Sequence, residues 1–201
     1  MLIVIDNFIA HDDPILADLQ SEETWENINE AENPRICTNW LDKDGTATNV
    51  FEALTNKVWD YAMGMLPEEY DGKEYWYSTL NNVKSLDMHR DKDEAHMMKT
   101  GRLVHPYIGS IYYCHKELPE GGFLQIDRPE SGEGHMERLQ PLPNRLIIFD
   151  SDSYHGVTQI HSGIRRHVAS NIWINKPDED NFTTGRYKEL VEDREKMLEN
   201  M

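Results

Sequence analysis

The sequence predicts a mainly β fold, a barrel or sandwich flanked by helices. After residue 72, short segments rich in β-branched and aromatic residues follow one another, and turn-forming residues separate most of them. Many short strands at such spacing are typical of barrels and sandwiches. Between residues 48 and 65, by contrast, apolar residues recur at helical spacing. We therefore expect a single α+β domain over residues 1–201, with helical support at about 10–65 and a β core at about 73–176.

The first part of the chain predicts one strand and two helical regions. LIVID reads as a short opening strand, and DDPILADLQ reads as a helix start with Pro14 near the first turn. Residues 32–46 carry Pro, Asn, Asp and Gly and predict a loop or irregular edge. The stretch from about 48 to 65 predicts an amphipathic helix whose apolar stripe faces the core. Its members are Val50, Phe51, Leu54, Val58, Trp59, Ala62 and Met65.

The second part predicts a succession of strands and a final helix. The expected strands lie in EYWYSTL, LDMHRD, YIGSIYYCH, GGFLQI, RLIIFD, HGVTQI and RHVASNIWIN. Residues 184–200 read as a charged helix with a thin apolar line, which either lies across the barrel or frays.

Composition restricts the class of protein. Hydrophobic residues make up 38% of the chain and charged residues 28%, which is a globular composition. No apolar run approaches the roughly 20 residues that span a bilayer, and the opening lacks the basic leader of a secretion signal. We expect a soluble, cytoplasmic protein without a membrane partner. The net charge of −17 repels phosphate backbones, so no nucleic-acid partner is expected.

Cysteine usage restricts the kind of metal site. The chain has two cysteines, Cys37 and Cys114, which lie far apart and form no CxxC unit. A disulfide framework and a cysteine-rich zinc site are both disfavoured. Any metal must therefore be held by imidazole and carboxylate groups.

A candidate for such a site begins at MHRDKDE. In a strand, His89 and Asp91 would present an imidazole and a carboxylate on one face. His155, which follows RLIIFDSDSY, is the candidate for a third ligand at the mouth of the barrel. Two histidines and one carboxylate leave open positions on an octahedral metal, as in non-haem Fe(II) oxygenases. The alternatives are a solvated loop for the pair and a hydrogen-bonded loop histidine for His155.

Two further residues suggest an anion site near this group. Arg165 lies in the segment HSGIRRHVASNIW, and an arginine inside a barrel is costly unless it meets an anion, which its planar fork matches bidentately. Its neighbour Arg166 would then point outward, and a simple surface ion pair is the alternative for either residue. Of Tyr112 and Tyr113, only one can face the interior, where a buried hydroxyl needs a partner. Packing in the barrel wall is the alternative for each tyrosine.

Taken in order, these residues resemble the Fe(II)- and 2-oxoglutarate-dependent dioxygenases, specifically the prolyl 4-hydroxylase-like branch. The ordered set is His89-x-Asp91, Tyr112-Tyr113, Gly121-Gly122, His155 and Gly163-x-Arg165. The opening VIDNFIAHDD and the segment RLIIFDSDSYHGV are also similar to that branch, so the resemblance covers most of the chain.

The resemblance implies a cupin-like double-stranded β-helix, or jelly roll, with helices packed on one side. It implies Fe(II) ligation by His89, Asp91 and His155. It also implies binding of the 2-oxoglutarate C5-carboxylate by Arg165, with help from Tyr113, and ascorbate as a supporting reductant. One departure is His167, which stands where many members carry serine, two residues after the arginine. A family position about ten residues before the first ligand falls near Thr79 and Tyr77 and stays unassigned.

The implied activity is hydroxylation of a C–H bond with O2 and 2-oxoglutarate, releasing succinate and CO2. The branch favours a prolyl or other amino-acid residue of a peptide or protein as substrate. A free amino acid or another small molecule is the alternative, and so is a metal-binding jelly roll without oxygenase activity. Residues 92–106, rich in Met and charge, are either a lid over the site or a surface connection.

Overall fold

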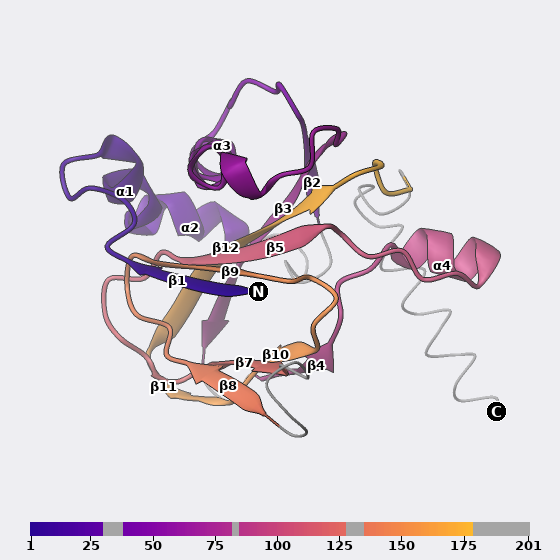
Figure 1. Ribbon diagram of the computed structural model, residues 1–201. Helices are drawn as coiled ribbons and strands as arrows, with labels where there is room; N and C mark the ends of the chain where they lie inside the picture. The colour runs from indigo at the N-terminus through magenta and orange to yellow at the C-terminus, as the bar shows by residue number, and fades with distance from the viewer. Residues whose placement is uncertain (30–37, 82–84, 128–134, 179–201) are drawn as a thin grey trace.

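Two antiparallel sheets stack on each other, and three helices lie against the outer side of the larger sheet (Figure 1). The computed structural model describes residues 1–29, 38–81, 85–127 and 135–178. The larger sheet contains, in spatial order, β1 (Leu2–Asp6), β9 (Arg145–Phe149), β5 (Ile108–Tyr113), β12 (Ile164–Trp173), β3 (Gly72–Asn81) and β2 (Asn39–Asp42). The smaller contains β4 (Leu86–His89), β10 (His155–Val157), β7 (Leu124–Asp127) and β8 (Met136–Leu139). A third pair joins β6 (Glu120–Gly121) to β11 (Ile160–Ser162).

Side chains cap the first free N–H groups of three of the helices, whereas the 3-10 turn has no such cap. The helices are α1 (Pro14–Leu19), α2 (Glu22–Asn29), α3 (Val50–Tyr61), the 3-10 turn η1 (Met63–Met65) and α4 (Glu94–Thr100). Asn49 caps α3, because its Oδ1 accepts hydrogen bonds from the backbone N–H groups of Phe51 and Glu52, both at 3.0 Å. Asp13 caps α1 in the same way, directly before Pro14. The predicted amphipathic helix is confirmed over Val50–Tyr61, and the last residue of its expected stripe, Met65, lies in η1.

Strand alternation divides the apolar residues into two cores. One core lies between the helices and the larger sheet and includes Trp25, Trp59 and Ile172. The other lies between the two sheets and includes Ile126 and Phe149. Because neighbouring residues of a strand point to opposite faces, the larger sheet contributes side chains to both cores.

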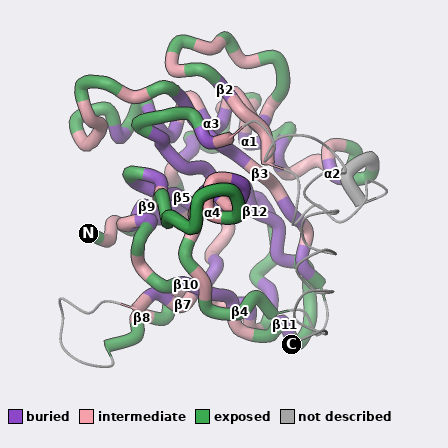
Figure 2. The backbone as a smooth tube through the Cα atoms, turned by 90° about the vertical axis from the view of Figure 1, so that its right-hand side faces the viewer, coloured by how far each residue is buried: buried purple, intermediate pink, exposed green. Residues whose placement is uncertain are grey.

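Strand β12 lies at the centre of this arrangement. It pairs with β3 along its full length, from Ile164 to Trp173, and with β5 from His167 to Ile172. Figure 2 shows β5 and β12 as largely buried, whereas α4 is only partly covered. The odd-numbered residues of β12 from position 165 onward face the smaller sheet, and the even-numbered residues face the helices.

The structure corrects two expectations about irregular segments. Within residues 32–46, Asn39–Asp42 form the edge strand β2, because Trp40 and Leu41 pair with β3. Within residues 92–106, the expected loop contains α4, which Asp93 caps and Gly101 ends in a left-handed conformation. The helix expected at 184–200 lies outside the described residues. None of the helices in the described part of the chain combines the length and hydrophobicity that a bilayer crossing requires.

Candidate metal centre

His89 and His155 meet because β4 and β10 are neighbours in the smaller sheet. His89 ends β4 and His155 begins β10, and the two residues are paired across the strands. Their imidazole centroids lie 4.4 Å apart. Gly156 permits this approach, since a Cβ there would lie 2.8 Å from the Leu86 carbonyl oxygen. Strand register therefore brings together two histidines that are far apart in the sequence.

Asp91 completes the group from just beyond the end of β4. Its Oδ1 lies 3.7 Å from Nε2 of His89 and 3.7 Å from Nε2 of His155. One donor atom from each of the three residues falls within 4.8 Å of the others. The i, i+2 spacing thus joins His89 to Asp91 as predicted, although β4 ends at His89 and the carboxylate stands on the following loop.

Hydrogen bonds orient both imidazoles with Nε2 toward the common centre. Nδ1–H of His89 donates to the Asp87 carbonyl at 2.8 Å, and Nδ1–H of His155 donates to the Ser153 carbonyl at 3.0 Å. A backbone carbonyl on the second nitrogen is the usual support of a metal-binding histidine, because it fixes the tautomer and the ring direction. Burial lowers the pKa of His155, which favours the neutral imidazole that a metal requires.

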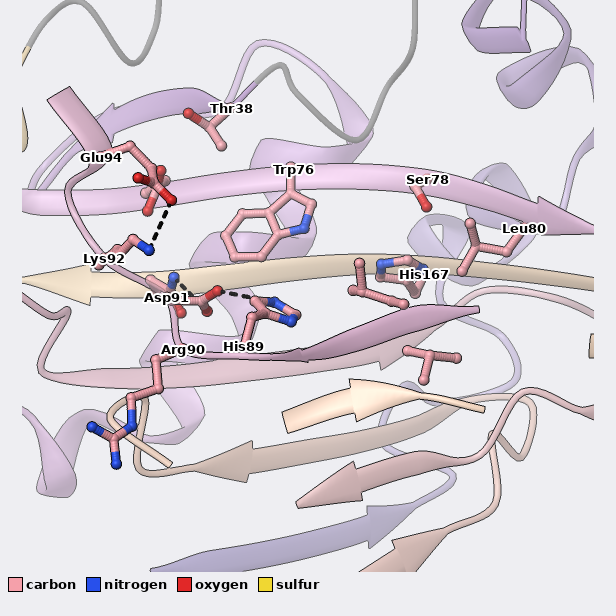
Figure 3. Close-up of a pocket in the computed structure, with 14 residues that line it drawn as sticks. Thr38, Trp76, Ser78, Leu80, His89, Arg90, Asp91, Lys92, Glu94 and His167 are labelled. Atoms are coloured by element: carbon pink, nitrogen blue, oxygen red, sulfur yellow. Dashed lines mark hydrogen bonds and ion pairs between the residues drawn. The ribbon is translucent and has the colours of Figure 1, made fainter. Parts of the chain in front are cut away.

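A cavity of about 270 Å³ opens beside these residues, which is small by the standard of ligand pockets. Figure 3 shows Trp76, Ser78 and His167 lining it from the larger sheet, with His89 and Asp91 opposite, while Arg90 points away. The full lining is Thr38, Glu74, Trp76, Ser78, Leu80, Leu86, His89, Arg90, Asp91, Lys92, Glu94, Val157, His167 and Asn171.

Arg165 is fully buried, with 0% of its surface exposed. Nη1 donates to Nδ1 of His167 at 2.9 Å, Nη2 donates to the Tyr113 hydroxyl at 3.4 Å, and Nε has no partner in the described part of the chain. Among the described residues, no carboxylate pairs with this guanidinium. Gly122 lies against it, since a Cβ there would be 3.1 Å from Cδ of Arg165. A fully buried guanidinium without a carboxylate partner among the described residues is a candidate anion-binding group.

His167 stands at the cavity wall, whereas Arg165 does not line the cavity itself. Because a guanidinium only donates hydrogen bonds, Nδ1 of His167 must be the acceptor in this contact. The ring proton of a neutral His167 is therefore on Nε2. The residue that departs from the family pattern thus replaces a serine hydroxyl with an imidazole bonded to the arginine.

The two tyrosines and two arginines divide between the faces of the larger sheet. Tyr113 lies between the sheets beside Arg165, while Tyr112 faces the helices and donates from its hydroxyl to Oδ1 of Asn144 at 2.9 Å. Arg166 also faces the helices, where Nη1 donates to Oε1 of Glu22 at 2.8 Å. It points away from Arg165 as predicted, but α2 covers it, so the ion pair is only partly exposed.

Neither Tyr77 nor Thr79 lines the cavity. The ring of Tyr77 stacks on Phe51 of α3, with centroids 4.0 Å apart. Strand alternation instead brings Trp76 and Ser78 of β3 to the cavity. The sequence contains both pairs side by side, and only the register of β3 shows which pair faces inward.

Two further polar residues of the cavity wall lie near the three candidate ligands. Asn171 of β12 donates from Nδ2 to Oδ2 of Asp91 at 3.1 Å. Glu74 of β3 accepts from Nε1 of Trp173 at 2.8 Å, and burial raises its pKa to about 7. Sequence analysis did not identify either residue, because nothing local distinguishes them from other strand positions.

The family model described as the 2OG-Fe(II) oxygenase superfamily matches residues 75–175 of this chain. The chain belongs to that superfamily. It is therefore a 2-oxoglutarate-dependent non-haem iron dioxygenase, and its cofactors are Fe(II) and 2-oxoglutarate. The sequence matches no curated protein.

The fold of this oxygenase is similar to those of solved prolyl hydroxylases. A prolyl 4-hydroxylase from Pseudomonas putida aligns with a TM-score of 0.59 and 14% identity over 86% of this chain and 91% of that chain. A prolyl hydroxylase from Trichoplax adhaerens, solved with a hypoxia inducible factor peptide fragment, aligns with a TM-score of 0.58 and 14% identity over 90% and 85%. HygX from Streptomyces hygroscopicus, with nickel and 2-oxoglutarate bound, aligns at 0.53 and 11% over 86% and 81%. These likenesses establish the double-stranded β-helix.

Proposed function

We propose that His89, Asp91 and His155 hold Fe(II), and that Arg165 anchors the C5-carboxylate of 2-oxoglutarate. The observation that carries the proposal is that two structural requirements are met in one molecule. Three convergent donor atoms lie at one end of the barrel, and a buried arginine without a carboxylate partner among the described residues lies in the same interior. A two-histidine, one-carboxylate set leaves positions open for other ligands.

The residues around Arg165 would shape the cosubstrate site. Tyr113 lies beneath the guanidinium, whose carbon is 5.0 Å from the ring centroid, and its hydroxyl adds a polar group. His167 presents a polar ring at the cavity wall, while Leu80 and Val157 supply apolar surface. A dicarboxylate suits these residues chemically, because a carboxylate pairs with a guanidinium and an aliphatic chain packs against apolar side chains. Arg165 does not line the cavity, so one end of the dicarboxylate would reach it past the ring of His167.

The activity that we propose is hydroxylation of a C–H bond in a prolyl or other amino-acid residue. Iron and 2-oxoglutarate would supply the oxidising chemistry, in which O2 and 2-oxoglutarate yield a hydroxylated substrate, succinate and CO2. The fold shared with prolyl hydroxylases and the presence of a cavity beside the triad support a peptide or amino-acid substrate. The wall of that cavity remote from His167 carries Thr38, Glu94 and Lys92, which could contact such a substrate (Figure 3).

The test is succinate formation with Fe(II), 2-oxoglutarate and a panel of proline-containing peptides and free amino acids. We expect substrate-dependent turnover by the wild-type protein and its loss in Asp91→Ala, because the only carboxylate of the triad is removed. Asp152→Ala is the matched control, since Asp152 is an exposed aspartate in the turn before His155. Normal turnover by Asp91→Ala would show that the ligand assignment is wrong.

A further inference from the structure

Two buried polar side chains that line the cavity, Asn171 and Glu74, lie next to the candidate metal centre. Asn171 and Glu74 are partners across β12 and β3, and both are buried. Nδ2 of Asn171 donates to Oδ2 of Asp91 at 3.1 Å, and Glu74 is the neighbour of Asn171 across the strands. Nε1 of Trp173 donates to Oε2 of Glu74 at 2.8 Å. Asn171 therefore joins these buried polar residues of β12 and β3 to the carboxylate of the triad.

The orientation of the Asn171 amide is set from both sides. On one side, Oδ2 of Asp91 is a carboxylate oxygen that accepts a hydrogen bond, so the NH2 group of Asn171 faces it. On the other side, Gly109 of β5 is the cross-strand partner of Asn171. A Cβ at position 109 would lie 2.8 Å from Oδ1 of Asn171, too close for the amide to stay in place. Glycine at position 109 avoids this clash with the Asn171 amide.

The two oxygens of Asp91 thus have different environments. Oδ1 is the atom that lies 3.7 Å from Nε2 of each histidine, whereas Oδ2 is engaged by Asn171. A carboxylate that is free to rotate can bind a metal with both oxygens, as carboxylates do on calcium. In the proposed centre that second bond would occupy a position needed by 2-oxoglutarate or O2.

We propose that Asn171, which has room for its amide because position 109 is glycine, is a positioning residue that keeps Asp91 bound to the metal through Oδ1 alone. This inference rests on the ligand set proposed above. Residues that orient ligands in this way contribute about 10- to 100-fold to metal affinity in other sites.

The experiment titrates the metal-free protein with Co(II) and measures the dissociation constant by calorimetry and the d–d absorption of the bound ion. The variants are Asn171→Ala, which removes the donor, and Gly109→Ala, which keeps the donor and every proposed ligand but displaces the amide. Gly64→Ala is the control, because a Cβ at Gly64 meets no atom within 4 Å. We expect both test variants to bind Co(II) about 10- to 100-fold more weakly with a changed d–d spectrum, and the control to match wild type.

Two results would overturn the inference, and they differ in whether they also overturn the proposed ligand set. If the wild-type protein binds no Co(II), the proposed ligand set fails and the role of Asn171 fails with it. If the wild-type protein binds Co(II) and both test variants match its affinity and spectrum, only the role of Asn171 fails. Thermal unfolding of the metal-free variants shows whether each one folds, and Gly109→Ala decides the question if Asn171→Ala does not.

Discussion

Arg165 is the residue whose environment most restricts the chemistry of the interior. Its charge is buried against Tyr113 and His167, neither of which carries a carboxylate. Leaving a guanidinium in such a place without an anion is costly, and a bound carboxylate offsets that cost. This cost supports the anchoring role that we propose for Arg165.

Replacement of Arg165 by lysine separates charge from geometry. Lysine keeps the positive charge but lacks the planar fork, so we expect 2-oxoglutarate to bind about 10- to 100-fold more weakly. The measurement is calorimetry in the presence of a redox-silent divalent metal. Arg166→Lys is the control, because Arg166 lies on the opposite face and pairs with Glu22. Equal affinities in the two variants would place the carboxylate site elsewhere.

Glu74 predicts a pH dependence of stability in the metal-free protein. Burial raises its pKa from the ordinary 4.5 to about 7, so between these values the folded chain holds a proton that the unfolded chain has lost. Stability contributed by this group is thus complete below pH 4.5 and is lost as the pH rises to about 7, by about 3 kcal/mol. In Glu74→Gln this loss should be absent, which urea unfolding at a series of pH values measures. Parallel pH profiles for the two proteins would contradict the expectation.

Residues of the candidate site that stand in a distinctive local pattern could be predicted from the sequence, and the remaining site residues could not. His89, Asp91, His155 and Arg165 stand at spacings that the sequence displays, and the structure brings the first three together. Asn171 acts through a neighbour 80 positions earlier in the chain, so its role depends on strand pairing. No feature of the local sequence shows that pairing.

Among the elements, α4 is the one whose attachment bears on access to the cavity. Its N-cap Asp93 accepts from the backbone N–H of His96 at 2.8 Å and from that of Asp178 at 2.9 Å. Two contacts join the start of residues 92–106 to their end. Asp93 N–H donates to the Val104 carbonyl, and Nδ1 of His105 contacts the Asp91 carbonyl at 2.6 Å. Its C-terminal turn is more exposed, and Lys99 there forms an ion pair with Asp178 at 2.6 Å.

Removal of the Asp93 cap should loosen α4 without changing the metal ligands. Asp93→Ala loses a helix cap, which costs about 1 kcal/mol and raises the open population about fivefold. We expect trypsin to cleave after Lys99 and Arg102 about five times faster. The same digestion with 2-oxoglutarate and Mn(II) added tests whether residues 92–106 form a lid, and cleavage that the ligand leaves unchanged would favour a surface connection.

Element prediction succeeded where periodicity was long and failed where it was short. The stripe of α3 extends over three turns, and its cap residue Asn49 precedes it. In contrast, α4 has seven residues, of which only Ala95 is buried, so it shows no apolar stripe. Its signals were Asp93 and Gly101, which mark a helix as well as a turn.

On the scale of the whole molecule, the net charge of −17 opposes compaction. Raising the ionic strength from about 0.01 M to about 1 M shortens the Debye length from about 30 Å to about 3 Å. We therefore expect sodium chloride to increase the free energy of unfolding by about 1 kcal/mol over that range, measured by urea denaturation. A decrease with salt would mean that ion pairs such as Arg145 with Asp6 outweigh the repulsion.

The class of the fold was predictable, whereas the order of its strands was not. Turn residues and β-branched runs mark individual strands, because those signals are local. The first strand, β1, pairs with β9, which lies some 140 residues later. Such long-range pairing depends on how both cores close, and the sequence alone contains no local trace of it.

One strand, β12, carries the anion anchor at one end and the partner of Asp91 toward the other. Arg165 and Asn171 face the same side of the strand, the interior, because they are separated by an even number of residue positions. Arg166 is next to Arg165 and therefore faces the helices. Deleting or inserting one residue between them would reverse the facing of one relative to the other. This part of the chain can consequently accept substitutions during divergence or engineering, but no change in length of a single residue.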